Sequence, residues 1–221
     1  MKLDIMDLNE LKLNNLGIDK KEFGKIYTFI DFGNVDYWFE HDEKDGNGNI
    51  LPAGNKSVIS LEKLAEFSNL FFEHRRFYYG VDPKNHKSLH FVIKARSCYN
   101  FAGSKPIQRI KHYLKDTELQ GNTRSLCEDM QGKYIYIPKC NFDVEISVDA
   151  IRLFEKYDTF CLFSSDVDFT ALVRFLKKKG KKFILFSAGY VSHWLTDEAT
   201  LNINAQKIKK DITFIKQKPR L

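Results

Sequence analysis

Residues 158–168 read Asp158-Thr-Phe-Cys-Leu-Phe-Ser164-Ser-Asp166-Val-Asp168, a nearly unbroken apolar run that ends in serines and acids. Such a short, continuous apolar run is typical of a strand buried on both faces of a parallel sheet. The stretch Lys25-Ile-Tyr-Thr-Phe-Ile-Asp31 repeats the pattern and continues as Phe-Gly-Asn34. Since ligands bind at the carboxyl ends of strands in open α/β sheets, these two stretches predict an α/β fold with a polar site at one edge.

The rest of the chain alternates between strand and helix patterns. Further strands are predicted at 75–80, 106–115, 134–138 and 182–187, and helices at 60–72, 84–100, 143–156 and 169–179. Strands that alternate with helices of about 10–15 residues predict right-handed crossovers and a mainly parallel sheet.

The length of 221 residues suits one α/β domain and is short for two. Residues 1–24 are polar with scattered leucines, and predict a short helix or arm outside the main fold. Residues 25–221 are expected to form a single domain that includes a C-terminal helical segment. The turn-rich stretch 41–49 is interpreted as an exposed loop, since it does not fit the spacing of a calcium-binding loop.

Composition excludes several classes of protein. Hydrophobic residues make up 43% of the chain, enough for a buried core, and no apolar stretch approaches the ~18 residues of a membrane span. Acids interrupt the N-terminus where a signal peptide would be apolar. The four cysteines have neither zinc-site nor disulfide-scaffold spacing. We therefore expect a cytoplasmic protein with no membrane partner.

Lys and Arg outnumber Asp and Glu by 35 to 29, which gives a net charge of +6. A basic protein favours an anionic partner, and nucleic acid is the commonest one. An ordinary solvated surface with a basic excess remains the alternative.

Acids follow several of the predicted elements at the same end of the sheet. The four candidates are Asp31, Asp143, Asp166 and Asp168. Neighbouring carboxylates repel one another unless a cation or a proton compensates, so a site for Mg²⁺ or Mn²⁺ is the economical interpretation. Each acid alone could instead cap a helix.

Known phosphate-binding and nucleophile motifs are absent from the sequence. It contains no G-x-G-x-x-G, no Walker-type loop, no G-x-S-x-G elbow and no H-E-x-x-H. Dinucleotide-dependent, P-loop, serine hydrolase and zinc protease chemistries therefore lack their usual sequence support.

The order of motifs resembles the NYN domain family. These motifs are Phe-Ile-Asp31-Phe-Gly-Asn34, Asp143-Val-Glu-Ile-x-x-Asp149 and Leu-Phe-Ser-Ser-Asp166-Val-Asp168-Phe. That family is similar to the PIN-domain nucleases and includes the LabA-like proteins. The resemblance covers about residues 25–187 and implies a three-layer α/β/α, PIN-like (Rossmann-like) fold and a metal-dependent ribonuclease. Ser165 stands where the family often has glycine.

The resemblance also implies roles for single residues. Asp31, Asp143, Asp166 and Asp168 are expected to be the catalytic, metal-binding acids, with Asn34 and Ser164 supporting them. Asp149 lies six residues after Asp143, about 240° around a helix, so we expect it to lie behind the site and to hold Asn34 or a water. For the same reason Glu145 is expected to be exposed.

We expect hydrolysis of RNA, preferably single-stranded, by water that Mg²⁺ or Mn²⁺ activates. Tyr99 and Phe101 are candidates to stack unpaired bases, with an ordinary core and helix face as the alternative. The candidate nucleic-acid-binding residues are Lys94, Arg96, Lys105, Arg109, Lys111 and Lys139. DNA as substrate, a non-catalytic RNA- or metal-binding module, a phosphoesterase acting on small molecules, and a homodimer all stay open.

Overall fold

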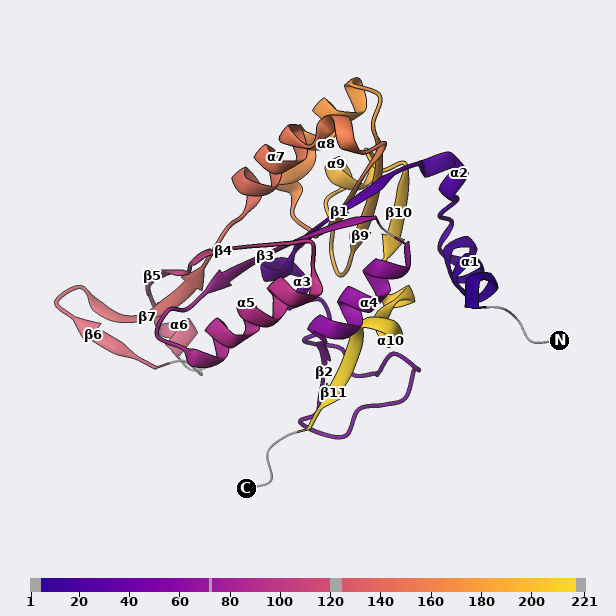
Figure 1. Ribbon diagram of the computed structural model, residues 1–221. Helices are drawn as coiled ribbons and strands as arrows, with labels where there is room; N and C mark the ends of the chain where they lie inside the picture. The colour runs from indigo at the N-terminus through magenta and orange to yellow at the C-terminus, as the bar shows by residue number, and fades with distance from the viewer. Residues whose placement is uncertain (1–4, 72, 120–124, 218–221) are drawn as a thin grey trace.

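The computed structural model describes residues 5–71, 73–119 and 125–217, and its centre is a six-stranded sheet in the order β10-β9-β8-β1-β3-β4 (Figure 1). Every neighbouring pair in this sheet is parallel. The strands are β1 (Ile26–Asp31), β3 (His74–Val81), β4 (Phe101–Pro106), β8 (Thr159–Phe163), β9 (Lys182–Ser187) and β10 (Leu201–Asn204).

Helices cover both faces of the sheet, which gives three layers (Figure 1). Side chains alternate between the faces: Phe29 of β1 packs under α7 and α8, whereas Ile30 packs on the opposite side, where α1, α4 and α5 contribute. The helices are α1 (Ile5–Leu16), α2 (Lys20–Phe23), α3 (Phe32–Val35), α4 (Leu61–Phe71), α5 (His86–Cys98), α6 (Asp116–Leu119), α7 (Asp143–Arg152), α8 (Thr170–Lys178), α9 (His193–Thr196) and α10 (Lys209–Ile212), with 3-10 turns at Phe154–Lys156, Val167–Phe169 and Ala205–Lys207. The α/β/α fold class is confirmed.

Two of the predicted strands exist but lie outside the central sheet. The segment predicted at 106–115 is β5 (Gln108–Tyr113), and it pairs antiparallel with β7 (Gly132–Lys139), which also pairs with β6 (Cys127–Asp129). This three-stranded sheet, called the arm below, projects from the body beyond β4 (Figure 1). One edge strand of the central sheet, next to the arm, is β4, which has no apolar run to signal it because an edge strand is less buried.

The two ends of the chain are packed into the fold. The expected N-terminal helix is present, but Leu13, Ile18 and Phe23 are buried in the main core, so this segment does not stand outside the fold. The C-terminal segment contains α10 and then β11 (Thr213–Lys216), which pairs antiparallel with β2 (Lys56–Ile59). The loop at 41–49 is anchored to α10, since Lys209 donates to the Asp42 carboxylate at 2.6 Å.

The strand order changes direction at β1. The chain continues from β1 to β3 and β4 on one side, and returns to β8, β9 and β10 on the other. The connections after β1 and β8 therefore diverge and leave a crevice at the carboxyl ends of these two strands. The acids that follow β1 and β8 lie at this crevice.

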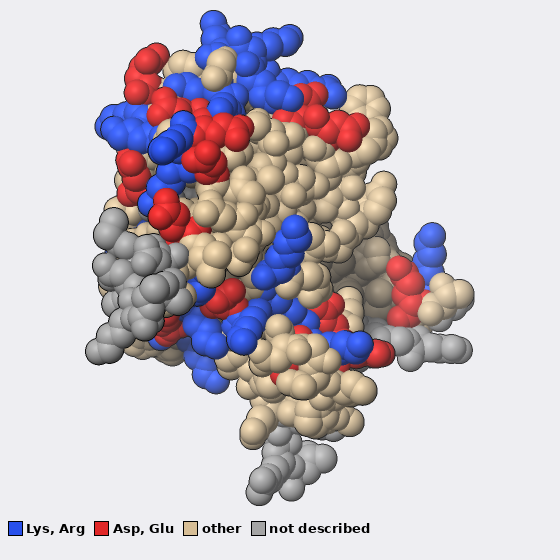
Figure 2. All heavy atoms as spheres, turned by 90° about the vertical axis from the view of Figure 1, so that its right-hand side faces the viewer, with Lys and Arg blue, Asp and Glu red and all other residues tan. Residues whose placement is uncertain are grey.

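Figure 2 shows the side of the molecule that carries α1 and α2. Lys and Arg are interspersed with Asp and Glu at its upper end, and a broad band without charged side chains crosses its middle. A polyanion gains little from such a band, because its affinity comes mainly from contacts between phosphates and cations.

Across residues 5–71, 73–119 and 125–217, no helix is long and apolar enough to cross a membrane.

Candidate metal centre

Three carboxylates meet at the crevice. Asp143 begins α7, and Asp166 and Asp168 lie in the turn between β8 and α8. One oxygen from each lies within 4.8 Å of the others, close enough for a single cation to contact all three. The turn after β8 is set locally, since Asp166 accepts a hydrogen bond from the Asp168 amide at 3.0 Å. The capping role that each acid could have had alone is therefore real for Asp166, and coexists with the cluster.

Asp31 lies deeper than these three, at the end of β1 and 7% exposed. The Ser164 hydroxyl donates to Asp31 Oδ2 at 3.2 Å, and the backbone N–H of Asn34 also donates to this carboxylate. The pKa of Asp31 is raised to about 7, chiefly by burial; the hydrogen bond from Ser164 opposes the rise, and the charges of Asp143 and Asp166 add to it. A carboxylate in this environment needs a proton or a cation to be stable.

Asp143 is only partly compensated, because the Asn141 side chain and the charge of Lys105 favour its ionised form while burial and its acidic neighbours oppose it. Its Oδ1 is buried without a hydrogen-bond partner, while its amide donates to Asn141 Oδ1 at 2.9 Å. Burial is the main cause of its raised pKa, and the charges of Asp166 and Asp168 add to it. An orphaned carboxylate oxygen that faces two other acids is an observation a hard cation would explain.

Asn34 and the serines after β8 hold the crevice together. Asn34 Oδ1 accepts from the Ser165 amide at 2.8 Å and from Trp38 Nε1 at 3.1 Å, which ties the turn after β1 to the turn after β8. The Ser165 hydroxyl exchanges hydrogen bonds with the backbone of Ala188 after β9. The supporting role expected for Asn34 and Ser164 fits these contacts.

Asp149 does something other than expected. It does not hold Asn34. Its Oδ2 accepts from Arg76 Nη2 at 2.6 Å and from the Tyr78 hydroxyl at 2.8 Å, and so it joins α7 to β3. Glu145 is also not freely exposed, because Lys105 donates to its Oε1 at 2.5 Å, beside the acidic cluster.

The structure separates the candidate cationic residues into groups. Lys94 is paired with Glu62 between α5 and α4, and Arg96 lies on the same helix. Lys105 is held at the site by Glu145. Arg109 and Lys111 lie on the arm, paired with Asp82 and Asp129, and Lys139 ends β7 exposed. These cations do not form one patch.

Tyr99 does not stack on nucleic acid. It is buried in the core, and its ring stacks on Phe77 with centroids 4.8 Å apart. Phe101 is partly exposed, but the Arg76 guanidinium covers its ring at 3.8 Å. The core interpretation is correct for Tyr99.

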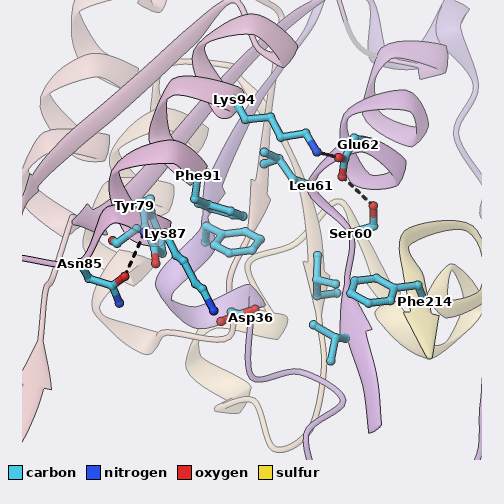
Figure 3. Close-up of a pocket in the computed structure, with 14 residues that line it drawn as sticks. Asp36, Ser60, Leu61, Glu62, Tyr79, Asn85, Lys87, Phe91, Lys94 and Phe214 are labelled. Atoms are coloured by element: carbon cyan, nitrogen blue, oxygen red, sulfur yellow. Dashed lines mark hydrogen bonds and ion pairs between the residues drawn. The ribbon is translucent and has the colours of Figure 1, made fainter. Parts of the chain in front are cut away.

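Two adjoining grooves share several lining residues, and one of them lies next to Asp31. The nearer one, about 410 Å³, is lined by Gly33 and Cys140 next to Asp31, and by Asp82, Pro138 and Lys139. The farther one, about 700 Å³, lies between α5 and β2. Figure 3 shows Lys87 reaching across it toward Asp36. On the opposite wall, Glu62 forms an ion pair with Lys94 and accepts a hydrogen bond from the Ser60 hydroxyl. Asp82 follows β3, so the strand-end rule could have identified it from the sequence.

The family model of the NYN domain matches residues 25–205. The chain belongs to the NYN domain family. It is thus a member of a PIN-like nuclease family, and the acidic cluster lies in the part of the chain that matches.

One solved structure shares the fold of this NYN protein. The crystal structure of a protein of unknown function from Vibrio parahaemolyticus is 19% identical and has a TM-score of 0.58, covering 89% of this chain and 100% of that one. At this identity the likeness concerns the fold alone. No curated protein matches the sequence significantly.

Proposed function

We propose that this NYN protein is a metal-dependent ribonuclease that hydrolyses phosphodiester bonds of single-stranded RNA. The observation that carries the proposal is the meeting of Asp143, Asp166 and Asp168 within 4.8 Å at the crevice between β1 and β8. Carboxylates gathered at this position in an open parallel sheet favour a common site, in addition to the cap that Asp166 provides.

The residues fit a hard divalent cation. All the donors are oxygens, and the orphaned Oδ1 of Asp143 offers an unshared ligand atom. Asp143, Asp166 and Asp168 would hold the ion, Mg²⁺ or Mn²⁺, with Asp31 behind them. When bound, such an ion supplies positive charge for the phosphoryl group that is transferred.

The chain itself supplies position and charge. Asn34 and Ser164 fix the two turns that present the acids, so the carboxylates are placed before substrate arrives. Lys105 lies beside the cluster, with its ammonium group held by Glu145, at a place where it can contact a phosphate of the substrate. The chain needs no nucleophilic side chain for this reaction, because water attacks the phosphorus.

The first test replaces Asp166 with asparagine, which keeps the oxygen that accepts from the Asp168 amide and removes the charge. Cleavage of labelled single-stranded RNA is expected to require Mg²⁺ or Mn²⁺, to stop in EDTA, and to fall at least about 100-fold in Asp166→Asn. Asp197→Asn, an exposed acid near α9, is the matched control and is expected to cleave like the wild type.

Other outcomes select other functions. RNA binding without cleavage under either metal would indicate a binding module. Hydrolysis of a chromogenic monoester without cleavage of RNA would indicate a phosphoesterase for small molecules. Cleavage that survives in Asp166→Asn would contradict the proposed site.

A further inference from the structure

One face of the arm carries aromatic and cationic side chains at alternate positions. The antiparallel register places Lys111 opposite Tyr136 and Tyr113 opposite Tyr134, so these four share a face. Arg109 and Pro138 continue the same face toward the body of the protein. We call this set of six residues the tyrosine face.

Two of the tyrosine rings of this face remain exposed to solvent in the folded arm. Tyr113 is 36% exposed and Tyr136 is 45% exposed; on the reverse face, Ile135 is 7% exposed and Ile110 is 43% exposed. The tyrosines thus lie on an exposed face of the arm, and the reverse face is buried at Ile135 but exposed at Ile110. Tyr134 meets both other rings edge-on, with centroids 5.7 and 5.5 Å apart, and so holds the exposed rings of Tyr113 and Tyr136 in place.

The cations of this face are held in fixed places. Lys111 lies over the Tyr134 ring at 3.8 Å and is paired with Asp129. Arg109 uses Nη2 to contact Asp82 at 2.9 Å, which leaves its remaining N–H groups for another acceptor. Lys139, at the base of the arm, lies on the reverse face beside Pro138, and no ion pair of the described residues includes it. Phosphates would therefore meet cations already in position.

The tyrosine face is continuous with the acidic site. Pro138, its innermost residue, lines the 410 Å³ groove together with Asp82, the partner of Arg109. The other end of that groove is Gly33 and Cys140, beside Asp31. The chain also runs directly from β7 into α7, whose first residue is Asp143.

We propose that the tyrosine face binds the single-stranded part of the RNA substrate that leads away from the cleaved bond, with unpaired bases stacked on Tyr113 and Tyr136. This inference rests on the proposed function, because the strand that it places is the substrate. Stacking needs bases whose faces are free, and a duplex hides them. Five residue steps along β7 separate Lys139 from Tyr134, or about 17 Å, so only an oligonucleotide of several residues reaches from the acids to the tyrosines.

Binding is tested separately from cleavage. Fluorescence anisotropy measures the affinity of the Asp166→Asn protein, in EDTA, for a labelled oligouridylate of about 12 nucleotides. Adding Tyr113→Ala with Tyr136→Ala is expected to weaken binding at least about 10-fold. Adding Lys111→Gln is expected to weaken it less and to lower the salt dependence by about one phosphate contact. A duplex of the same length is expected to compete poorly.

Matched controls come from α8, on the other side of the fold. Phe175→Ala removes an exposed ring and Lys178→Gln removes an exposed cation, and both are expected to keep the parental affinity. Thermal melting followed by circular dichroism verifies that each variant is folded.

Parental affinity in both arm variants would overturn the inference, whereas the nuclease proposal would still be decided by cleavage in the Asp166 experiment. Equal binding of duplex and single strand would also overturn it. A third result would overturn it as well: light scattering could show that the wild type is a dimer and that the arm variants are monomers with unchanged RNA affinity. The tyrosine face would then contact a second copy of the chain.

Discussion

Replacing Asp31 with asparagine is expected to stabilise the metal-free protein near pH 8 by on the order of 3 kcal/mol, and to lower RNA cleavage at least about 100-fold. The pKa of Asp31 is raised from 3.8 to about 7, chiefly by burial, so its ionised form costs folding free energy at neutral and alkaline pH. The rise of this pKa corresponds to about 4 kcal/mol of unfolding free energy. The expected gain is smaller, because the side chain of the asparagine variant accepts weaker hydrogen bonds than a carboxylate does. Such opposite changes mark a residue retained for function at the expense of stability.

The sign of the pH dependence follows from the raised pKa. Above pH 3.8 the folded state holds a proton that the unfolded chain releases, so the wild-type stability contributed by Asp31 falls as pH rises from about 4 to about 7 and then levels off. Asp31→Asn is expected to lack this fall. In thermal melting in EDTA near pH 8, the variant is expected to melt roughly 8 °C higher.

Asp197→Asn serves as the control and is expected to change stability by less than about 0.5 kcal/mol. Added Mg²⁺ is expected to stabilise the wild type, because an ion that binds only the folded state shifts the equilibrium toward it. A lower melting temperature for Asp31→Asn than for the wild type would show that Asp31 is a structural acid and would contradict this account.

Replacing Asp149 with alanine is expected to destabilise the protein by about 3 kcal/mol, or roughly 8 °C in melting temperature. The change leaves the buried guanidinium of Arg76 without its carboxylate and the Tyr78 hydroxyl without its acceptor. Removing one partner of a buried ion pair costs much more than the pair contributes, because the remaining charge stays desolvated.

Glu155→Ala, an exposed acid in the turn after α7, is the matched control and is expected to be nearly neutral. Chemical denaturation measures both variants, and cleavage at a temperature where both are folded separates stability from activity. If Asp149→Ala were as stable as the control but unable to cleave RNA, Asp149 would have a role in the acidic site and the structural role argued here would be wrong.

Much of the fold could be predicted because its strands are recognisable from short stretches of consecutive residues. The unbroken apolar runs of β1, β8 and β9 reflect strands buried on both faces, and this burial is a property of consecutive residues. The acids after β1 and β8 followed from the same patterns, since parallel strands bring their carboxyl ends to one edge. The edge strand β4 and the pairing of β2 with β11 carry no such signal, being short and partly exposed.

What the sequence by itself determined, then, is the α/β class, the family motifs and the end of the sheet where the acids gather. Only the tertiary structure decided that Asp143 faces Asp166 while Asp149 turns to Arg76, that Tyr99 is core, and that the arm presents exposed tyrosines on one face. The reason is physical. Periodicity records whether a residue is buried, whereas its partner depends on how elements distant in the chain pack, and no local pattern encodes that packing.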